Sequence, residues 1–255
     1  AWATGAQGDI GERERRGRER GEMEEANVGG VVLPGDVIGT VTADLRIGNG
    51  LMQDTDRIVA TKAGCLCFRE PNRYWIDNVQ KRYIPALEES VVGVVIDRHG
   101  EGFKVDIRSA MPASLSWESF PLASRKNRPN LKPGALVYGR VTLASKDMEP
   151  EMACSTMAGR AGGYGELKGG TLLPECSLSL CRALLTHSSR EYRVLELLGR
   201  RIPYEITVGL NGRIWVNSSE PKHTVIIANT ILRSEGLSSA QAELLVKSML
   251  EQLPS

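Results

Sequence analysis

The chain has 255 residues, of which 41% are hydrophobic, only 5% are aromatic and 27 are glycine. This composition permits hydrophobic cores, and it favours several small, turn-rich β units over one broad core. The formal net charge is +1, which excludes a uniformly basic nucleic-acid binder and limits any nucleic-acid site to a local patch. No run approaches the ~18 apolar residues of a membrane span, so we expect no membrane partner.

Residues 1–28 are predicted to be a disordered, charged tail. Residues 11–25 mix charges of both signs and contain one apolar side chain, Met23. Such a segment buries too little surface to offset the entropy of ordering. It could act as an arm that binds RNA or a partner, but the near-cancellation of charge favours a solvated tail.

Residues 29–87 are predicted to form a small N-terminal β domain. Short alternating segments recur every eight to twelve residues at 45–52, 56–62, 65–69, 73–77 and 82–85, joined by Gly, Pro and Asn. Tyr74 and Trp75 are neighbours, so one ring is expected to face inward and the other outward. Cys65 and Cys67 would share one face of a strand, where they cannot easily bridge each other. We therefore expect reduced cysteines in an intracellular protein.

Residues 88–154 are predicted to form an OB-fold barrel. Strands are expected at 91–97, 102–107, 112–116, 136–141 and 152–156, with a tight turn at 98–102. The long connection at 117–132 lies between the third and fourth strands. Five short strands in this arrangement are typical of an OB barrel, which binds oligonucleotides through a strand face and its loops.

Residues 155–255 are predicted to form an α+β domain. Helical spacing occurs at 178–185, 190–198 and 224–233, and a last helix at 238–253 opens with a Ser238/Gln241 capping box. Between them, residues 204–208 and 213–217 alternate as a hairpin. Helices on one face of a three-stranded sheet are therefore expected.

The barrel segment carries the strongest candidate for nucleic-acid binding. Residues 119–146 contain six Lys or Arg and no Asp or Glu. Cations in a surface loop can neutralise phosphates without reading sequence, although an acidic protein partner would fit equally well. The predicted RNA-binding residues are Arg125, Lys126, Arg128, Lys132, Arg140 and Lys104.

Gly209-Leu210-Asn211-Gly212 matches the GxxG loop with which KH domains clamp a nucleic-acid backbone. The two middle residues carry no positive charge, and Asn-Gly between two strands fully explains a hairpin turn. We therefore favour a structural turn over an RNA clamp.

No catalytic constellation is present in the sequence. The three histidines lie in separate units, and neither a phosphate-binding GxxxxGK[ST] loop nor paired cysteine motifs for zinc occur. Asp147, Glu149 and Glu151 alternate at a domain junction, where carboxylates more often pair with Arg or cap a turn than hold a metal. We expect no catalytic residue, no metal and no cofactor.

Residues 125–152 (RKNRPN…VYGRV…KDMEPEM), together with YWIDNVQKRYIP at 74–85, PASLSWESF at 112–120 and GLNGRIWV at 209–216, carry a family resemblance. The barrel resembles the OB-type RNA-binding domain of ribosomal protein S-one. The whole set, over about residues 30–250, resembles the exosome component family of ribosomal RNA-processing protein 40. The resemblance implies an N-terminal β domain, an OB barrel and a KH-type domain whose GxNG loop is a structural turn.

The same resemblance implies a non-enzymatic cap subunit of the RNA exosome. Such a subunit would bridge RNase-PH-like ring subunits, contact other cap subunits and guide RNA toward 3′→5′ processing in the nucleus, nucleolus and cytoplasm. It implies a hetero-oligomer and an RNA partner. The alternative is a purely structural module that stabilises the ring with little RNA contact.

Overall fold

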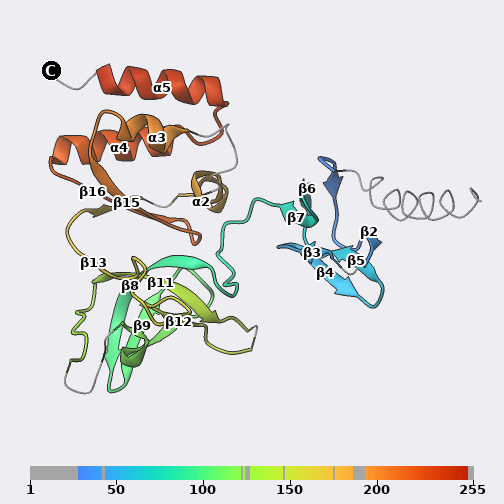
Figure 1. The fold of residues 1–255 in the computed structure, drawn as a ribbon, viewed down its shortest axis with the longest axis horizontal. Helices are drawn as coiled ribbons and strands as arrows, with labels where there is room; N and C mark the ends of the chain where they lie inside the picture. Colours follow the sequence, from blue (N-terminus) through green and yellow to red (C-terminus); the bar gives the residue numbers. More distant parts are fainter. Residues whose placement is uncertain are drawn as a thin grey trace, which may run out of the picture. The chain divides into compact units, whose positions relative to one another are not determined.

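The computed structural model describes residues 28–41, 44–121, 123, 127–145, 147–174, 176–185 and 193–251 of the chain. The predicted tail therefore lies outside the described residues, apart from Val28. The chain divides into two compact units, one ending at Val79 and the other beginning at Gln80. Figure 1 shows the elements of both units.

The first unit consists of two small sheets. One has the strand order β1-β6-β7-β3 and the other the order β2-β5-β4. Their strands are β1 (Val31–Val32), β2 (Val37–Thr40), β3 (Arg46–Ile47), β4 (Leu51–Asp54), β5 (Arg57–Ala60), β6 (Gly64–Arg69) and β7 (Arg73–Asp77). As predicted, Tyr74 faces the core at 8% exposure, and Trp75 beside it is half-buried. The core also contains Ile58, Leu66 and Ile76.

The strand predicted at residues 82–85 is wrong, because no regular element forms there. Pro85 lacks the N–H that a ladder needs. Tyr83 is instead buried in the core of the second unit, where its hydroxyl donates to Glu89 Oε2 at 2.7 Å.

The predicted OB barrel is confirmed at the start of the second unit. The order β12-β10-β9-β8-β11 is closed by pairing of β11 with β12, and β10 and β12 run parallel. The strands are β8 (Ser90–His99), β9 (Gly102–Asp106), β10 (Ala113–Ser116), β11 (Leu136–Leu143) and β12 (Glu151–Ala153). A 3₁₀ turn, η1 (Trp117–Ser119), follows β10. Alternate residues of each strand fill the barrel, including Val91, Val105, Leu115, Val137 and Met152.

The predicted α+β architecture is confirmed in the rest of the second unit. A three-stranded sheet has the order β14-β16-β15. Its strands and helices are β14 (Thr171–Leu172), α2 (Leu178–Leu185), α3 (Val194–Gly199), β15 (Tyr204–Gly209), β16 (Arg213–Ser218), α4 (Pro221–Arg233) and α5 (Ser239–Glu251). In Figure 1 the sheet lies between the barrel and helices α3, α4 and α5. Ile227, Ile231 and Val246 pack into the core from α4 and α5.

Helix boundaries follow the local capping chemistry. The capping box is confirmed, since Gln241 Oε1 accepts from the backbone N–H of Ser238 at 3.1 Å. Helix α4 begins three residues before the predicted start, because Pro221 occupies its first turn, where no N–H partner is needed. Helix α2 has the predicted bounds. The start of the helix predicted at 190–198 lies outside the described residues.

Only the three residues 168–170 connect the last strand of the barrel sheet to the first strand of the α+β part. Strand β13 (Gly165–Leu167) pairs with β11 of the barrel, and β14 pairs with β16 of the other sheet. Strand β13 follows the predicted domain boundary at residues 154/155 and yet pairs with the barrel. The boundary itself stays a prediction.

All five cysteines are free thiols. Cys65 is exposed, whereas three thiols of the second unit are buried: Cys154, Cys176 and Cys181. Burial raises the pKa of the three buried thiols to about 12, 11 and 12 respectively. Among the described residues, no helix is long and apolar enough to cross a membrane.

Candidate nucleic-acid interface

Arg128, one of the predicted RNA-binding residues, lies over an aromatic ring. Its guanidinium carbon lies 4.7 Å from the centroid of the Trp117 ring, a cation–π distance. Trp117 is half-buried in η1, and its backbone N–H donates to Glu101 O at 3.3 Å. The Trp117 backbone is therefore held to the β8–β9 hairpin, and the exposed Arg128 lies over its ring.

The tip of the β8–β9 hairpin adds two more side chains to this place. Arg98 Nη1 donates to Asn130 Oδ1 at 2.8 Å, which ties the loop after Arg128 to the hairpin. A shallow hollow of about 20 Å³ is lined by Arg98, His99, Gly100, Gly102, Phe103, Trp117, Arg128 and Pro129. We call Arg98, His99, Trp117 and Arg128 the hairpin-tip platform. The hollow has room for roughly one water molecule, so the platform is a contact surface and not a ligand cavity.

The sequence reasoning missed Arg98 and His99 because it assigned them only a turn role. The signal that could have found them is a cation and an imidazole adjacent at a hairpin tip next to the basic loop.

Two other predicted cations are engaged by acids distant in sequence. Arg140 is 13% exposed, its Nε donates to Ser155 O at 2.8 Å, and its Nη1 forms an ion pair with Glu88. Lys104 Nζ lies 3.4 Å from Glu149 Oε1. Both therefore have structural partners that phosphate would have to displace.

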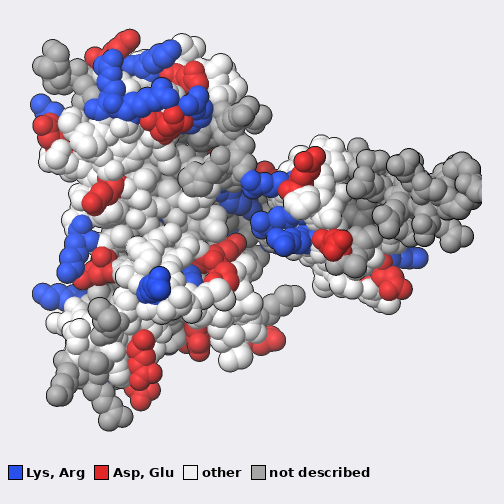
Figure 2. Space-filling model, viewed as in Figure 1, with Lys and Arg blue, Asp and Glu red and all other residues white. Residues whose placement is uncertain are grey.

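Lys132 is exposed on the same connection as Arg128, and Arg125 and Lys126 lie outside the described residues. Within the described parts of the chain, no group of three or more His, Cys, Asp or Glu is placed to hold a metal ion. On the face seen in Figure 2, basic and acidic atoms are interspersed, with a gathering of basic side chains over α3 and α5. There Glu196 accepts from Arg193 and Arg200, and these hydrogen bonds hold its pKa at about 2.

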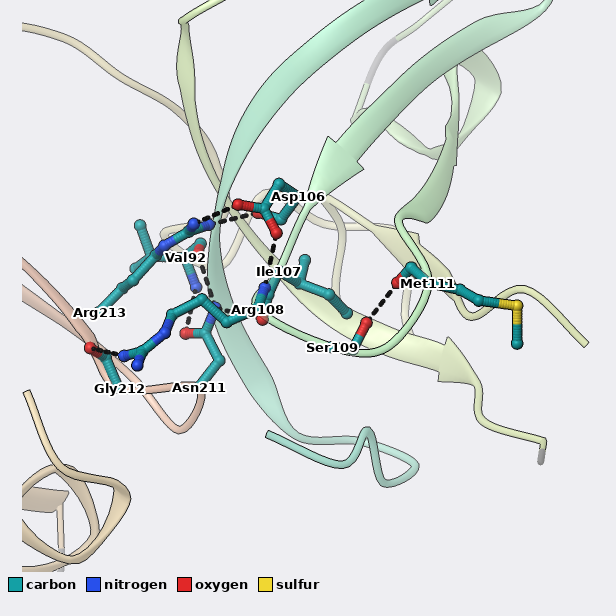
Figure 3. A network of polar contacts seen from close by, with 9 residues as sticks. All are labelled: Val92, Asp106, Ile107, Arg108, Ser109, Met111, Asn211, Gly212 and Arg213. Carbon is teal, nitrogen blue, oxygen red and sulfur yellow. Dashed lines mark hydrogen bonds and ion pairs between the residues drawn. The ribbon is translucent and has the colours of Figure 1, made fainter. Parts of the chain in front are cut away.

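The GxxG turn lies against the barrel (Figure 3). Asn211 is 0% exposed; its Oδ1 accepts from Val92 N at 3.2 Å, and its Nδ2 donates to Val92 O at 2.8 Å and Ile107 O at 3.0 Å. The backbone N–H of Leu210 donates to Ser90 O at 2.9 Å. The Leu210 N–H and the Asn211 amide are thus already bonded to the barrel, which supports a structural role for this turn over a phosphate clamp.

The two glycines of this turn allow its close approach to the barrel. A Cβ on Gly209 would lie 2.6 Å from Val92 N. Gly212 has φ +76°, and a Cβ there would lie 2.6 Å from both Arg108 Nη1 and Cys176 O. Glycine is therefore required here for packing between the two parts.

Two arginines complete this junction (Figure 3). Arg213 forms an ion pair with Asp106 Oδ2 and also donates to Asp106 O. Arg108 Nη1 donates to Gly212 O at 3.0 Å and to Cys176 O at 3.3 Å. Burial alone would raise the pKa of Asp106, but hydrogen bonds from the Arg108 backbone N–H and the Arg213 side chain outweigh it and lower the pKa. We call the contacts of Arg108, Asn211 and Arg213 with their partners the barrel–KH junction.

A closed OB barrel joined to an α+β unit with a GxxG turn defines a class: proteins built from nucleic-acid-binding domains. Three family models match the chain in order. They are the "Exosome complex exonuclease Rrp40 N-terminal domain" over residues 45–82, "Exosome complex component RRP40, S1 domain" over 83–165, and "KH domain" over 170–222.

Curated relatives match most of the chain. A protein of Dictyostelium discoideum assigned as exosome complex component rrp40 is 47% identical over 83% of this chain and 89% of its own length. Exosome complex component rrp40 of Schizosaccharomyces pombe is 42% identical over 91% of this chain and 99% of its own. A crystal structure assigned to an exosome complex RNA-binding protein has the same fold, with a TM-score of 0.54 at 22% identity over 67% of this chain and 97% of that one. The chain belongs to the exosome complex component RRP40 family, with an N-terminal domain, an S1 barrel of OB type and a KH domain.

Proposed function

We propose that the chain is an RNA-binding cap subunit of the RNA exosome that does not itself cut RNA. In this role it bridges RNase-PH-like ring subunits, meets other cap subunits, and guides RNA toward the central channel for 3′→5′ processing. Its work would include ribosomal RNA maturation and RNA turnover in the nucleus, nucleolus and cytoplasm. Family membership supports the exosome role, and the S1 and KH domains support RNA binding.

The barrel–KH junction decides which domain we assign to RNA contact and which to the scaffold role. Asn211 is fully buried and the turn N–H of Leu210 is bonded to the barrel. Because the Leu210 N–H and the Asn211 side-chain amide are already bonded to the barrel, we assign the RNA contact to the barrel and the scaffold role to the KH domain. The junction then fixes the barrel on the scaffold.

The assembly role is tested by isolating the tagged full chain from cells and identifying its partners by mass spectrometry. We expect RNase-PH-like ring proteins and other cap subunits in stoichiometric amounts. Recovery without any RNase-PH-like protein would refute the exosome assignment.

Imaging of the tagged chain should show nuclear and nucleolar signal together with a cytoplasmic pool.

The RNA role is tested by binding of single-stranded RNA to the purified full chain across a salt series. Each phosphate contact should contribute about −0.7 to the log–log slope for single strands.

The same protein incubated with RNA and Mg²⁺ should leave the RNA length unchanged. Any 3′ shortening would contradict the non-catalytic role.

A purely structural role is the second candidate, and the surface of the first unit favours it. Val37 and Met52 are each more than half exposed, and both pair with Val59, so they form an apolar row across β2-β5-β4. Exposed apolar rows of this kind mark protein contacts more often than RNA contacts. This candidate predicts that the isolated chain hardly binds RNA, while its removal destabilises the ring.

A further inference from the structure

We propose that the hairpin-tip platform is the RNA contact of the barrel, and that it holds one nucleotide of a single strand by stacking on Arg128. The proposal rests on the proposed function, because it names the surface through which the S1 barrel would touch RNA. It requires no contribution from the KH turn.

The geometry presents a preassembled stacking surface. The Arg128 guanidinium lies over the Trp117 ring, with 4.7 Å between the guanidinium carbon and the ring centroid. Arg128 is exposed, so its planar guanidinium is accessible to a base approaching from solvent. Unstacked RNA bases pack on both aromatic rings and guanidinium planes, and guanidinium groups are well suited to such stacks.

The platform is held in place from two sides, which reduces the entropy lost on binding. The Trp117 backbone is bonded to Glu101 of the hairpin, and Arg98 bridges to Asn130 of the basic loop. Phe103 forms the floor at 3% exposure and meets Phe120 edge-to-face at 6.4 Å between ring centroids.

The charges around the platform favour RNA over an acidic peptide. Arg98 and His99 are exposed and can donate hydrogen bonds to a phosphate. Glu101 and Glu118 are also exposed beside them, so a contact built on charge alone would be weak. An RNA nucleotide adds the stacking energy of a flat base, which the carboxylates of an acidic peptide do not provide.

Arg128 offers a substitution that separates stacking from charge. Arg128→Ala removes both, whereas Arg128→Lys keeps the positive charge and loses the plane. Arg233→Ala, an exposed cation at the end of α4 in the KH part, is the matched control. Circular dichroism and melting curves of the full-length variants would establish that all of them fold as the wild type does.

The first readout is fluorescence anisotropy of the full chain with an oligouridylate RNA and with an abasic ribose-phosphate strand of the same charge. Wild type should bind the base-bearing RNA about tenfold more tightly than the abasic strand, as one stacked base implies. Arg128→Ala should remove that preference. Arg128→Lys should lose most of it with an unchanged salt slope, and Arg233→Ala should keep it.

The second readout is photocrosslinking of 4-thiouridine RNA, followed by mass spectrometry, with the chain free and within the reconstituted exosome. Adducts are expected on the peptides that contain Trp117 or residues 98–99. Adducts found only on other peptides of the chain, with none on these two, would overturn the proposal.

The remaining outcomes separate the platform from the general function. If wild type binds RNA but Arg128→Lys and Arg128→Ala bind as wild type does, the platform is refuted and the RNA-binding cap role stands. If wild type binds no RNA either alone or in the complex, the platform and the RNA role fail together.

Discussion

Replacing Asn211 with alanine should separate the barrel from the KH domain. The side chain is fully buried and satisfies three backbone groups of the barrel: the N–H and C=O of Val92 and the C=O of Ile107. Both barrel residues are 0% exposed, so water does not readily replace the lost amide. Asn211→Ala therefore leaves buried polar groups without that partner in addition to losing its own contacts.

The expected loss follows from the number of hydrogen bonds. Each contributes about 1 kcal/mol net, and leaving a buried donor or acceptor unsatisfied adds to this, so we expect roughly 3–5 kcal/mol of lost stability. For a unit of this size, that corresponds to a fall in melting temperature of roughly 6–20 °C. Asn211→Asp should be at least as damaging, because a carboxylate cannot donate to the two carbonyls and repels them.

The assay is urea unfolding of the full chain combined with hydrogen exchange of the peptides spanning residues 90–107 and 204–218. In the wild type, both peptides should lose protection together, and in Asn211→Ala they should open separately. Asn217→Ala, which removes an amide bonded at 3.3 Å to the exposed Glu205, is the matched control and should change stability by less than about 0.5 kcal/mol. A loss below about 1 kcal/mol in Asn211→Ala, or equal to the control, would refute the reasoning.

Four further outcomes are expected. Gly212→Ala should destabilise the fold by about 2 kcal/mol or more in thermal melts, because φ is +76° and its Cβ would meet two atoms at 2.6 Å. Arg140→Ala should lower stability by about 1–3 kcal/mol through its lost ion pair and hydrogen bond, and a salt series should show an unchanged slope for RNA binding. The lowered pKa of Asp106 stabilises the fold above its ordinary value of 3.8, and this contribution is lost as pH falls through the lowered folded value; Asp106→Asn should flatten acid unfolding curves there. Iodoacetamide should modify exposed Cys65 in the native protein and reach the three buried thiols only after unfolding, as peptide mass spectrometry would show.

Local signals predicted most elements of this fold. The Asn-Gly pair between alternating runs predicted the β15–β16 hairpin, and Ser238 with Gln241 predicted the start of α5. These features succeed because turn and cap chemistry depends on residues only a few positions apart. The strand predicted at 82–85 failed because the apolar Tyr83 packs into a neighbouring core instead of a sheet.

The candidate site was less predictable, because its determinants are distant in sequence. Nothing near Arg140 or Lys104 indicates that Glu88 and Glu149 pair with them. Likewise, the side-chain amide of Asn211 finds its acceptors 119 and 104 residues away, in β8 and directly after β9 of another domain. A turn signal can show that a chain reverses direction, but it cannot show which surface the turn meets.

The direct passage from β13 in the barrel sheet to β14 in the KH sheet has a consequence for modular inheritance. Only residues 168–170 separate the two strands, and the barrel–KH junction adds side-chain contacts across the same seam. A genetic crossover at this seam would join a barrel to a foreign turn that lacks the matching asparagine and arginine. The barrel and the KH domain are therefore expected to be exchanged between genes as one block, whereas the first unit, with its own core, could be exchanged separately.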